Sequence, residues 1–373
     1  MIRLHGVTLR EIRLPLREPF RISSGEVSER RILLLESETD EGLRAWSECV
    51  AGEKPNYSPE TIDTAWHALR EWLVPRLLGE PIAHASRVHT RLDRHVRGHR
   101  MAKAALEMGI WALEAERAGL PLARSIGGVR DRIEVGISLG IQSVPDALVE
   151  RSLDAQRQGY RKIKIKIAPG ADIPFVAAVR ATLGPHAPIM VDANSAYTLD
   201  DAAHLAALDS FDLLMIEQPL DPEDLVRHAA LQRKLRTPIC LDESITAVSR
   251  ADDMIALRAG RIVNIKPGRV GGFAAARAIH DLCAMHGLPV WCGGMLESGV
   301  GRAYNVALAS LPNFRFPGDL SPSARYWTRD IVSPEWTMDP DGTLAVPLHR
   351  AGIGVDVDVD RVDDLTVRCE VLA

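Results

Sequence analysis

The sequence predicts an α/β fold, a (β/α)-barrel carrying an α+β capping domain. After about Arg132, short β-type runs alternate with amphipathic segments, which is the sequence form of βαβ units in a parallel sheet. Eight such runs recur at steps of 24 to 28 residues, as expected for an eight-unit barrel. The runs end near Ser138, Lys166, Asp192, Glu217, Asp242, Lys266, Cys292 and Asp319.

The chain length agrees with this division. At 373 residues the chain suits a barrel of roughly 200 to 250 residues plus a smaller domain. In the first part, an alternating run at 32–36 predicts a strand, and apolar spacing at 61–78 and 101–118 predicts helices. We expect a capping and lid domain at 1–127, the catalytic barrel at 128–325, and a C-terminal segment at 326–373 that returns to the cap. A doubly wound open sheet is disfavoured. Such a sheet would have a glycine-rich phosphate turn after its first strand, and this sequence lacks that turn.

Composition excludes several classes of partner. With 25% charged residues and a formal net charge of −5, the chain has no basic excess for nucleic acid. Charged residues interrupt the apolar ones between Met1 and Leu16, and no stretch approaches the length of a membrane span. The five cysteines include no Cys-x-x-Cys pair. We therefore expect a cytoplasmic protein with no membrane partner.

Acidic side chains end three successive predicted strands. Asp192 follows the run at 188–191, Glu217 follows 213–216, and Asp242 follows 237–241. Because active sites of (β/α)-barrels form at the carboxyl ends of the strands, these acids should converge. Three carboxylates in a partly buried mouth repel one another unless a cation neutralises them, and oxygen ligands favour Mg²⁺ or Mn²⁺ over zinc. The alternative for each acid alone is a helix N-cap or an arginine pair.

Lysines occupy one face of the second predicted strand. In the run 161–167 they alternate with isoleucines, so Lys164 and Lys166 should point into the barrel while the isoleucines meet the helices. Lys266 ends the sixth run and could face Lys166 across the barrel axis. A nearby metal would lower the pKa of these amines. The alternative, an edge strand with solvated lysines, conflicts with the position of this strand inside the repeat.

These lysines and acids, at these spacings, resemble the muconate-lactonizing-enzyme subgroup of the enolase superfamily. Residues 237–244, 263–272 and 289–295 are further similar to the o-succinylbenzoate synthase / N-succinylamino acid racemase family. The similarity covers most of the chain and is strongest over the barrel. It implies an enolase-type barrel with a small-molecule carboxylate substrate, and we also expect a homo-oligomer.

The resemblance implies a role for each matching residue. Asp192, Glu217 and Asp242 would be the metal ligands. Lys166 and Lys266 would be the acid/base pair, and Lys164 would pair with the substrate carboxylate. Groups supporting them would be Asn194, Asn264 and Glu243. The substrate would be bordered by Ser138, Gly293, Gly294 and Met295, and the loop around Phe20 and Arg21 would close over the mouth as a specificity lid.

Such a site implies removal of the proton next to a carboxylate through an enediolate intermediate. If Lys166 takes the proton and Lys266 returns one to the opposite face, the reaction is a racemisation. If the adjacent carbon carries a hydroxyl, protonation of that leaving group gives dehydration. The expected activities are o-succinylbenzoate synthesis, a step of menaquinone biosynthesis, and racemisation of N-succinyl or other N-acyl amino acids.

Other functions stay open at this point. Muconate cycloisomerase would use lysines and metal ligands of the same type. Dipeptide epimerases resemble the chain at the lysines, but they usually place paired acids at strand eight, where Asp319-Leu320-Ser321 offers one. Sugar-acid dehydratases would be expected to have a histidine near Cys292. A noncatalytic metal-binding barrel is the alternative from another class, and the two lysines argue against it.

Overall fold

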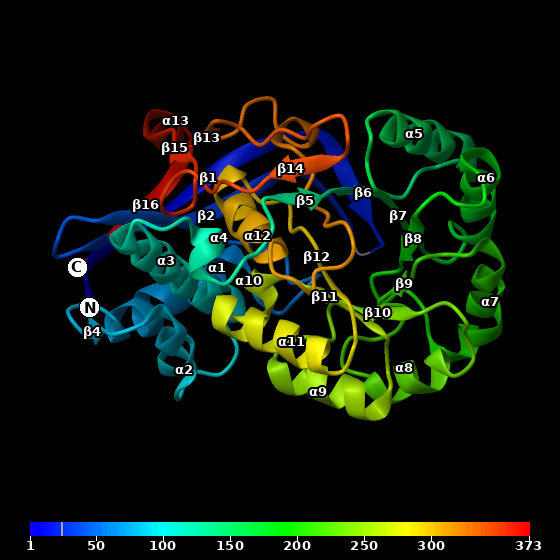
Figure 1. Ribbon diagram of the computed structural model, residues 1–373, viewed down its shortest axis with the longest axis horizontal. Helices are drawn as coiled ribbons and strands as arrows, with labels where there is room; N and C mark the ends of the chain where they lie inside the picture. The colour runs from blue at the N-terminus through cyan, green and yellow to red at the C-terminus, as the bar shows by residue number, and fades with distance from the viewer. Residues whose placement is uncertain (24) are drawn as a thin grey trace.

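A curled sheet of parallel strands forms the centre of the computed structural model, which describes residues 1–23 and 25–373. Its strand order is β12-β11-β10-β9-β8-β7-β6, and helices run along its outer side (Figure 1). The strands are β6 (Gly136–Leu139), β7 (Lys162–Lys166), β8 (Ile189–Asp192), β9 (Ile216–Glu217), β10 (Ile239–Leu241), β11 (Ile262–Ile265) and β12 (Val290–Cys292).

The crossovers between these strands are helical, as the amphipathic segments predict. They comprise α5 (Pro145–Arg157), α6 (Ile173–Leu183), η4 (Leu199–Asp201), α7 (Ala202–Ala206), η5 (Ala207–Phe211), α8 (Leu225–Gln232), α9 (Val248–Leu257), α10 (Pro267–Val270), α11 (Phe273–Met285) and α12 (Gly299–Ala309). None of the helices in the described part of the chain combines the length and apolar character that a membrane crossing requires.

The eighth predicted run is not a regular strand. The segment 314–319 lies between β12 and β6, and isolated bridges join it to Val290 and Val135. The amide of Asp319 donates to a β12 carbonyl at 2.9 Å. Pro317 has no N–H to donate, so a continuous ladder cannot form there. The predicted barrel is confirmed, but the prediction of an eighth strand is wrong in this detail.

Side chains inside the barrel are stratified along the strands. In β8, Ile189 and Val191 belong to the main core, whereas Met190 belongs to a separate apolar cluster with Cys240 and Trp291. Because successive residues of a strand point to opposite faces, Asp192 shares the inner face with Met190 and lies one step nearer the carboxyl end. Inside the barrel, the polar site therefore lies next to this apolar cluster, on the side of the carboxyl ends of the strands.

The capping domain is a second, antiparallel sheet with helices. Its sheet has the order β16-β1-β2-β3, and β4 pairs with the beginning of β1 at Ile2 and Arg3. The strands are β1 (Ile2–Ile22), β2 (Gly25–Thr39), β3 (Arg44–Cys49), β4 (Pro81–Ile82) and β16 (Thr366–Leu372). The helices are α1 (Ile62–Ala68), η1 (Leu69–Leu73), η2 (Val74–Arg76), η3 (Ala85–Arg87), α2 (Val88–Asp93), α3 (Arg100–Ala118) and α4 (Leu122–Ser125).

One predicted helix of the cap is divided. The segment 61–78 begins as α1, continues as a π-helical turn in η1, and ends as a 3-10 turn in η2. Pro75 lies in the first turn of η2, and a proline lacks the N–H that an uninterrupted α-helix would use. The second predicted helix, at 101–118, agrees with α3.

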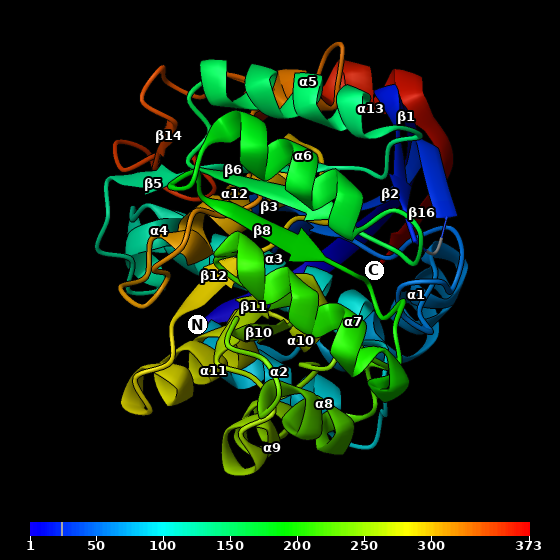
Figure 2. The same cartoon turned by 90° about the vertical axis from the view of Figure 1, so that its right-hand side faces the viewer.

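The C-terminal segment runs along both parts of the molecule. After η6 (Ser323–Arg325), β13 (Val332–Ser333) pairs with β15 (Asp356–Val357), and β14 (Thr343–Ala345) pairs with β5 (Arg132–Glu134). The alternating sequence at 355–360 ends in helix α13 (Val359–Leu365), which Asp358 caps. β16 then pairs antiparallel with β1, and Figure 2 shows it beside β1 and β2. The tail thus completes the cap sheet, while the boundaries at 127 and 325 stay predictions.

Candidate active site

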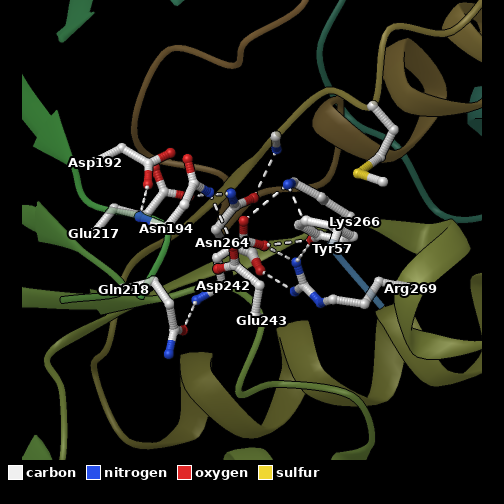
Figure 3. Close-up of polar contacts among 12 residues, drawn as sticks. Tyr57, Asp192, Asn194, Glu217, Gln218, Asp242, Glu243, Asn264, Lys266 and Arg269 are labelled. Atoms are coloured by element: carbon white, nitrogen blue, oxygen red, sulfur yellow. Dashed lines mark hydrogen bonds and ion pairs between the residues drawn. The ribbon is translucent and has the colours of Figure 1, made fainter. Parts of the chain in front are cut away.

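The three predicted acids are buried at the carboxyl ends of adjacent strands. Asp192 ends β8, Glu217 ends β9, and Asp242 directly follows β10, and each is at most 1% exposed. Asp192 of β8 is directly opposite Glu217 of β9 in the sheet. β9 in turn pairs with β10, which precedes Asp242. The structure therefore brings the three acids together at one end of the barrel (Figure 3).

The predicted lysine pair stands on either side of these acids. Lys166 ends β7 and donates to Asp192 Oδ2 at 2.6 Å, and Lys266 follows β11 and donates to Asp242 Oδ2 at 2.8 Å. The three strands β8, β9 and β10 separate β7 from β11 in the sheet. The two amines consequently approach the acidic group from opposite sides of the barrel.

Lys164 lies deeper on the same face of β7. Its Nζ contacts Asp192 and Glu217 at 3.2 Å each and Asp319 at 2.6 Å. Burial opposes the charge of this ammonium, but the three carboxylates, Asp319 foremost, raise the pKa of Lys164. Lys164 is therefore a fixed positive charge.

The other ionisable groups are shifted by burial and by one another. Burial, followed by the neighbouring charge of Asp192, raises the pKa of Glu217. Burial lowers the pKa of Lys166, which is the direction that a general base requires. Burial acts against the charge of Asp192, but the ammonium groups of Lys166 and Lys164 lower its pKa below the usual range.

Amide side chains orient the acids and lysines. Asn194 accepts from Lys166 at 2.6 Å and donates to Glu243 at 2.8 Å, and its φ of 43° places it in the left-handed region. Asn264 donates to Glu217 at 2.7 Å and accepts from the amide of Gly293 at 2.7 Å. The predicted supporting groups are thus in contact with the predicted ligands and base.

The donor set fits a hard divalent cation. It consists of carboxylate oxygens alone, and burial together with the neighbouring charge of Asp192 raises the pKa of Glu217. In the described ranges, no three His, Cys, Asp or Glu side chains are gathered closely enough to hold an ion as they stand. The carboxylate oxygens are instead bonded to lysine and arginine, so an ion would have to take over these bonds.

Sequence reasoning missed four residues of this site. Arg269 is buried and forms a close ion pair with Asp242, and Tyr57 reaches from the cap to within 3.2 Å of Asp242 and 3.1 Å of Lys266. The other two missed residues are Lys162 and Asp319, and Lys162 Nζ lies 3.2 Å from Asp319 Oδ1. The period-two pattern of β7 could have identified Lys162, and Asp319 stood at a predicted strand end. Nothing local in the sequence marks Tyr57 or Arg269.

A cavity of about 450 Å³ opens beside the lysines, between the cap and the barrel. Phe20, Gly294 and Met295 line it, as predicted, together with Lys166 and Lys266. Ser138, Arg21 and Gly293 are not among its described lining residues. Ser138 is buried in β6, and Gly293 packs against Asn264 and Lys266.

The predicted lid loop is a β-hairpin. Phe20 and Arg21 lie in β1, paired with Val27 and Glu26 of β2, because the strand pairing continues almost to the tip. The hairpin reaches the barrel mouth, where Ser23 Oγ donates to the carbonyl of Ala193 at 3.3 Å. Ser24 lies outside the described residues. Long strands thus bring Ser23 to the mouth, where a loop was expected.

Two family models together match most of the chain. Residues 147–362 match the enolase C-terminal domain-like family, and residues 4–127 match the N-terminal domain of mandelate racemase / muconate lactonizing enzyme. The chain belongs to the enolase superfamily. The predicted family, the predicted fold class and the prediction of an enzyme are confirmed. Members of this superfamily generally bind a divalent metal.

Sequence similarity to known proteins extends along almost the whole chain. An o-succinylbenzoate synthase from Geobacillus kaustophilus is 48% identical over 98% of this chain and 96% of its own. An N-succinylamino acid racemase from Amycolatopsis sp is 48% identical over 98% of both chains. A crystal structure of an enolase-superfamily member from Listeria innocua covers 100% of this chain and 99% of its own, with a TM-score of 0.96 and 39% identity.

Proposed function

We propose that this enolase-superfamily protein removes the proton next to a substrate carboxylate, and that it acts as an o-succinylbenzoate synthase, an N-succinylamino acid racemase, or both. The opposed amines carry the proposal: Lys166 on β7 and Lys266 after β11 lie on either side of three acid-bearing strands. An amine on each side can reach each face of one carbon. The names and 48% identities of the two relatives support this substrate class.

Asp192, Glu217 and Asp242 would hold the cation, which we propose to be Mg²⁺ because all three ligands are carboxylates. When bound, the cation stabilises the negative charge that develops on the substrate carboxylate as the proton leaves. A lysine or histidine base combined with Mg²⁺ is the general arrangement of enolase-superfamily sites, and the lysines and acids of this chain fit it.

The protein's own residues then divide the work. Lys164, held by Asp319, keeps a positive charge next to the substrate carboxylate. Lys166, oriented by Asn194, takes the proton from one face. For racemisation Lys266, held between Tyr57 and Asp242, returns a proton to the other face. For dehydration the lysine that acted as base protonates the leaving hydroxyl, and Lys266 stays a cation.

One contact favours N-acylated substrates over free dipeptides. A dipeptide epimerase would need a strand-eight carboxylate for the substrate amine. Asp319 is 4% exposed and is engaged by Lys162 and Lys164. The two lysines already neutralise this carboxylate, so it is not available to pair with a substrate ammonium. An acylated nitrogen carries no charge and needs no carboxylate partner.

Replacing Lys266 with Ala tests the two-base assignment. With added Mg²⁺, deuterium from the solvent should enter only one enantiomer of an N-succinyl amino acid, because only the face next to Lys166 keeps its base. We expect exchange of the other enantiomer to fall by about 10²- to 10⁴-fold. Proton NMR measures both rates, and Lys234→Ala, which removes an exposed lysine, is the matched control. Wild-type exchange of both enantiomers in the Lys266 variant would refute the assignment.

A further inference from the structure

Arg30 is a buried arginine in the wall of the cavity that contains Lys166 and Lys266. It lies on β2, and 6% of its surface is exposed. Its Nη2 donates to the carbonyls of Val50 and Ala51 at 3.5 and 3.4 Å, which is the long limit of a hydrogen bond. Within the described ranges its Nε has no hydrogen-bond partner, and no acidic side chain forms an ion pair with it.

The nearest acids are engaged elsewhere. Glu48 and Glu297 favour the charge of Arg30 from beyond ion-pair distance. Glu48 accepts hydrogen bonds from Ser298, and Glu297 accepts from Asn305 at 2.7 Å. A guanidinium remains charged even when burial lowers its pKa, and a buried charge without a partner is unfavourable. Arg30 is therefore a cation in the cavity wall whose charge no carboxylate of the described residues neutralises.

The other cations of the wall are less suited to this role. Arg31 is committed to Glu11 at 2.7 Å and to Asp63 at 2.9 Å. Lys54 is exposed, so solvent screens its charge. Lys166 and Lys266 contact the acids of the reaction centre. Among the described lining residues, Arg30 is the buried cation that is not held by a carboxylate.

We propose that Arg30 binds a second, distal carboxylate of the substrate and so makes the cavity selective for dicarboxylates. The inference rests on the proposed function and adds to it the recognition of the far end of the substrate. A guanidinium can bind a carboxylate through two parallel hydrogen bonds. The volume of about 450 Å³ lies within the usual range for small-ligand sites.

Two substrates of the same shape test this subsite. An N-succinyl amino acid ends in a carboxylate, and the N-succinamoyl derivative of the same amino acid ends in a neutral amide. We expect the wild type to prefer the carboxylate in kcat/KM, and Arg30→Met to reduce this preference by about ten- to a hundredfold, the range for a hydrogen bond to a charged group. Arg30→Lys should retain part of the preference, because it keeps the charge but loses the paired hydrogen bonds.

The preference within each variant is a ratio, so a general loss of activity or folding cancels. A wild type without any preference would overturn the inference, as would an equal loss for both substrates in Arg30→Met. Lys54→Met should keep the preference, and its loss in that variant alone would assign the subsite to Lys54. Calorimetric binding of the two compounds with Mg²⁺ separates this inference from the proposed function: discrimination lost in Arg30→Met supports the subsite even if no proton exchange occurs.

Discussion

At the scale of single residues, Asp319 connects the buried lysines of β7. It contacts Lys164 at 2.6 Å and Lys162 at 3.2 Å, and Lys162 in turn lies 3.4 Å from the centroid of the Trp291 ring. Burial acts against the charge of this carboxyl, but the two lysines lower the pKa of Asp319 to about 2. Two neighbouring ammonium groups on one strand would repel each other without this carboxylate, so Asp319 fixes the position of Lys164, which we propose contacts the substrate carboxylate.

Asp319→Asn should therefore destabilise the protein. Removing one partner leaves buried ammonium groups uncompensated, and breaking a buried pair costs about 3–5 kcal/mol. We expect the free energy of unfolding in urea to fall by this amount. Glu18→Gln breaks the largely exposed ion pair with Arg151 and is the control, with an expected change below about 1 kcal/mol. Equal stability of both variants would contradict a stabilising role of Asp319 between Lys162 and Lys164.

At the scale of elements, acidic residues of the cap bind the N-termini of barrel helices. Glu107 of α3 accepts from the amides of Phe273 and Ala274, which begin α11. Glu48 of β3 accepts from Ser298 and from the amide of Gly301 at the start of α12. Free amides at a helix N-terminus favour such acceptors. These contacts fix the cap, and with it Tyr57 and the β1–β2 hairpin, against the barrel.

The stability of the Glu107 contact should depend on pH. Burial raises the pKa of Glu107 from 4.5 to about 7, so the folded state keeps the proton over a range where the unfolded state loses it. Stability from this group is present below about pH 4.5 and is lost as pH rises to about 7, by about 3 kcal/mol at most. Glu107→Gln should lack this part of the slope in urea midpoints between pH 4.5 and 8. A variant with the wild-type slope would refute the shift.

At the scale of the whole molecule, the site is shared between the N-terminal cap and the barrel, and the C-terminal strand completes the cap sheet. The cap sheet needs β16 beside β1, and the cavity needs Phe20 and Tyr57 from the cap next to Lys266 of the barrel. Because a bound cation would join β8, β9 and β10, it should stabilise the assembled fold rather than one element. An ion that binds only the folded state adds stability by mass action.

Mg²⁺ should consequently raise the unfolding temperature. At an ion concentration a hundredfold above its dissociation constant, the gain is about 2.7 kcal/mol. Thermal unfolding with excess Mg²⁺ and with a chelator measures it. Glu217→Gln should lose most of the difference, while Asp356→Asn, at an exposed ion pair with Arg350, should keep it. No difference in the wild type would argue against a resident cation.

The sequence by itself determined the fold class and the strand ends at which the candidate site lies. Strand period and repeat length are local properties, so they predict which face Lys164 and Lys166 share and where Asp192 and Asp242 stand. The irregular eighth segment and the hairpin at Phe20 depend on pairing between distant segments, which these local patterns do not encode.

Only the tertiary structure decided which charges are paired. Several buried polar side chains have surroundings that are set by residues far away in the chain, as Asp242 is for Tyr57. These side chains are Lys162, Asp319, Arg269, Tyr57 and Arg30. Whether a charged side chain is neutralised, clamped or left available depends on the burial and distance of its partners, and packing sets both. The spacing of residues along a strand therefore predicts the candidate reacting groups, but not the contacts that hold them in place.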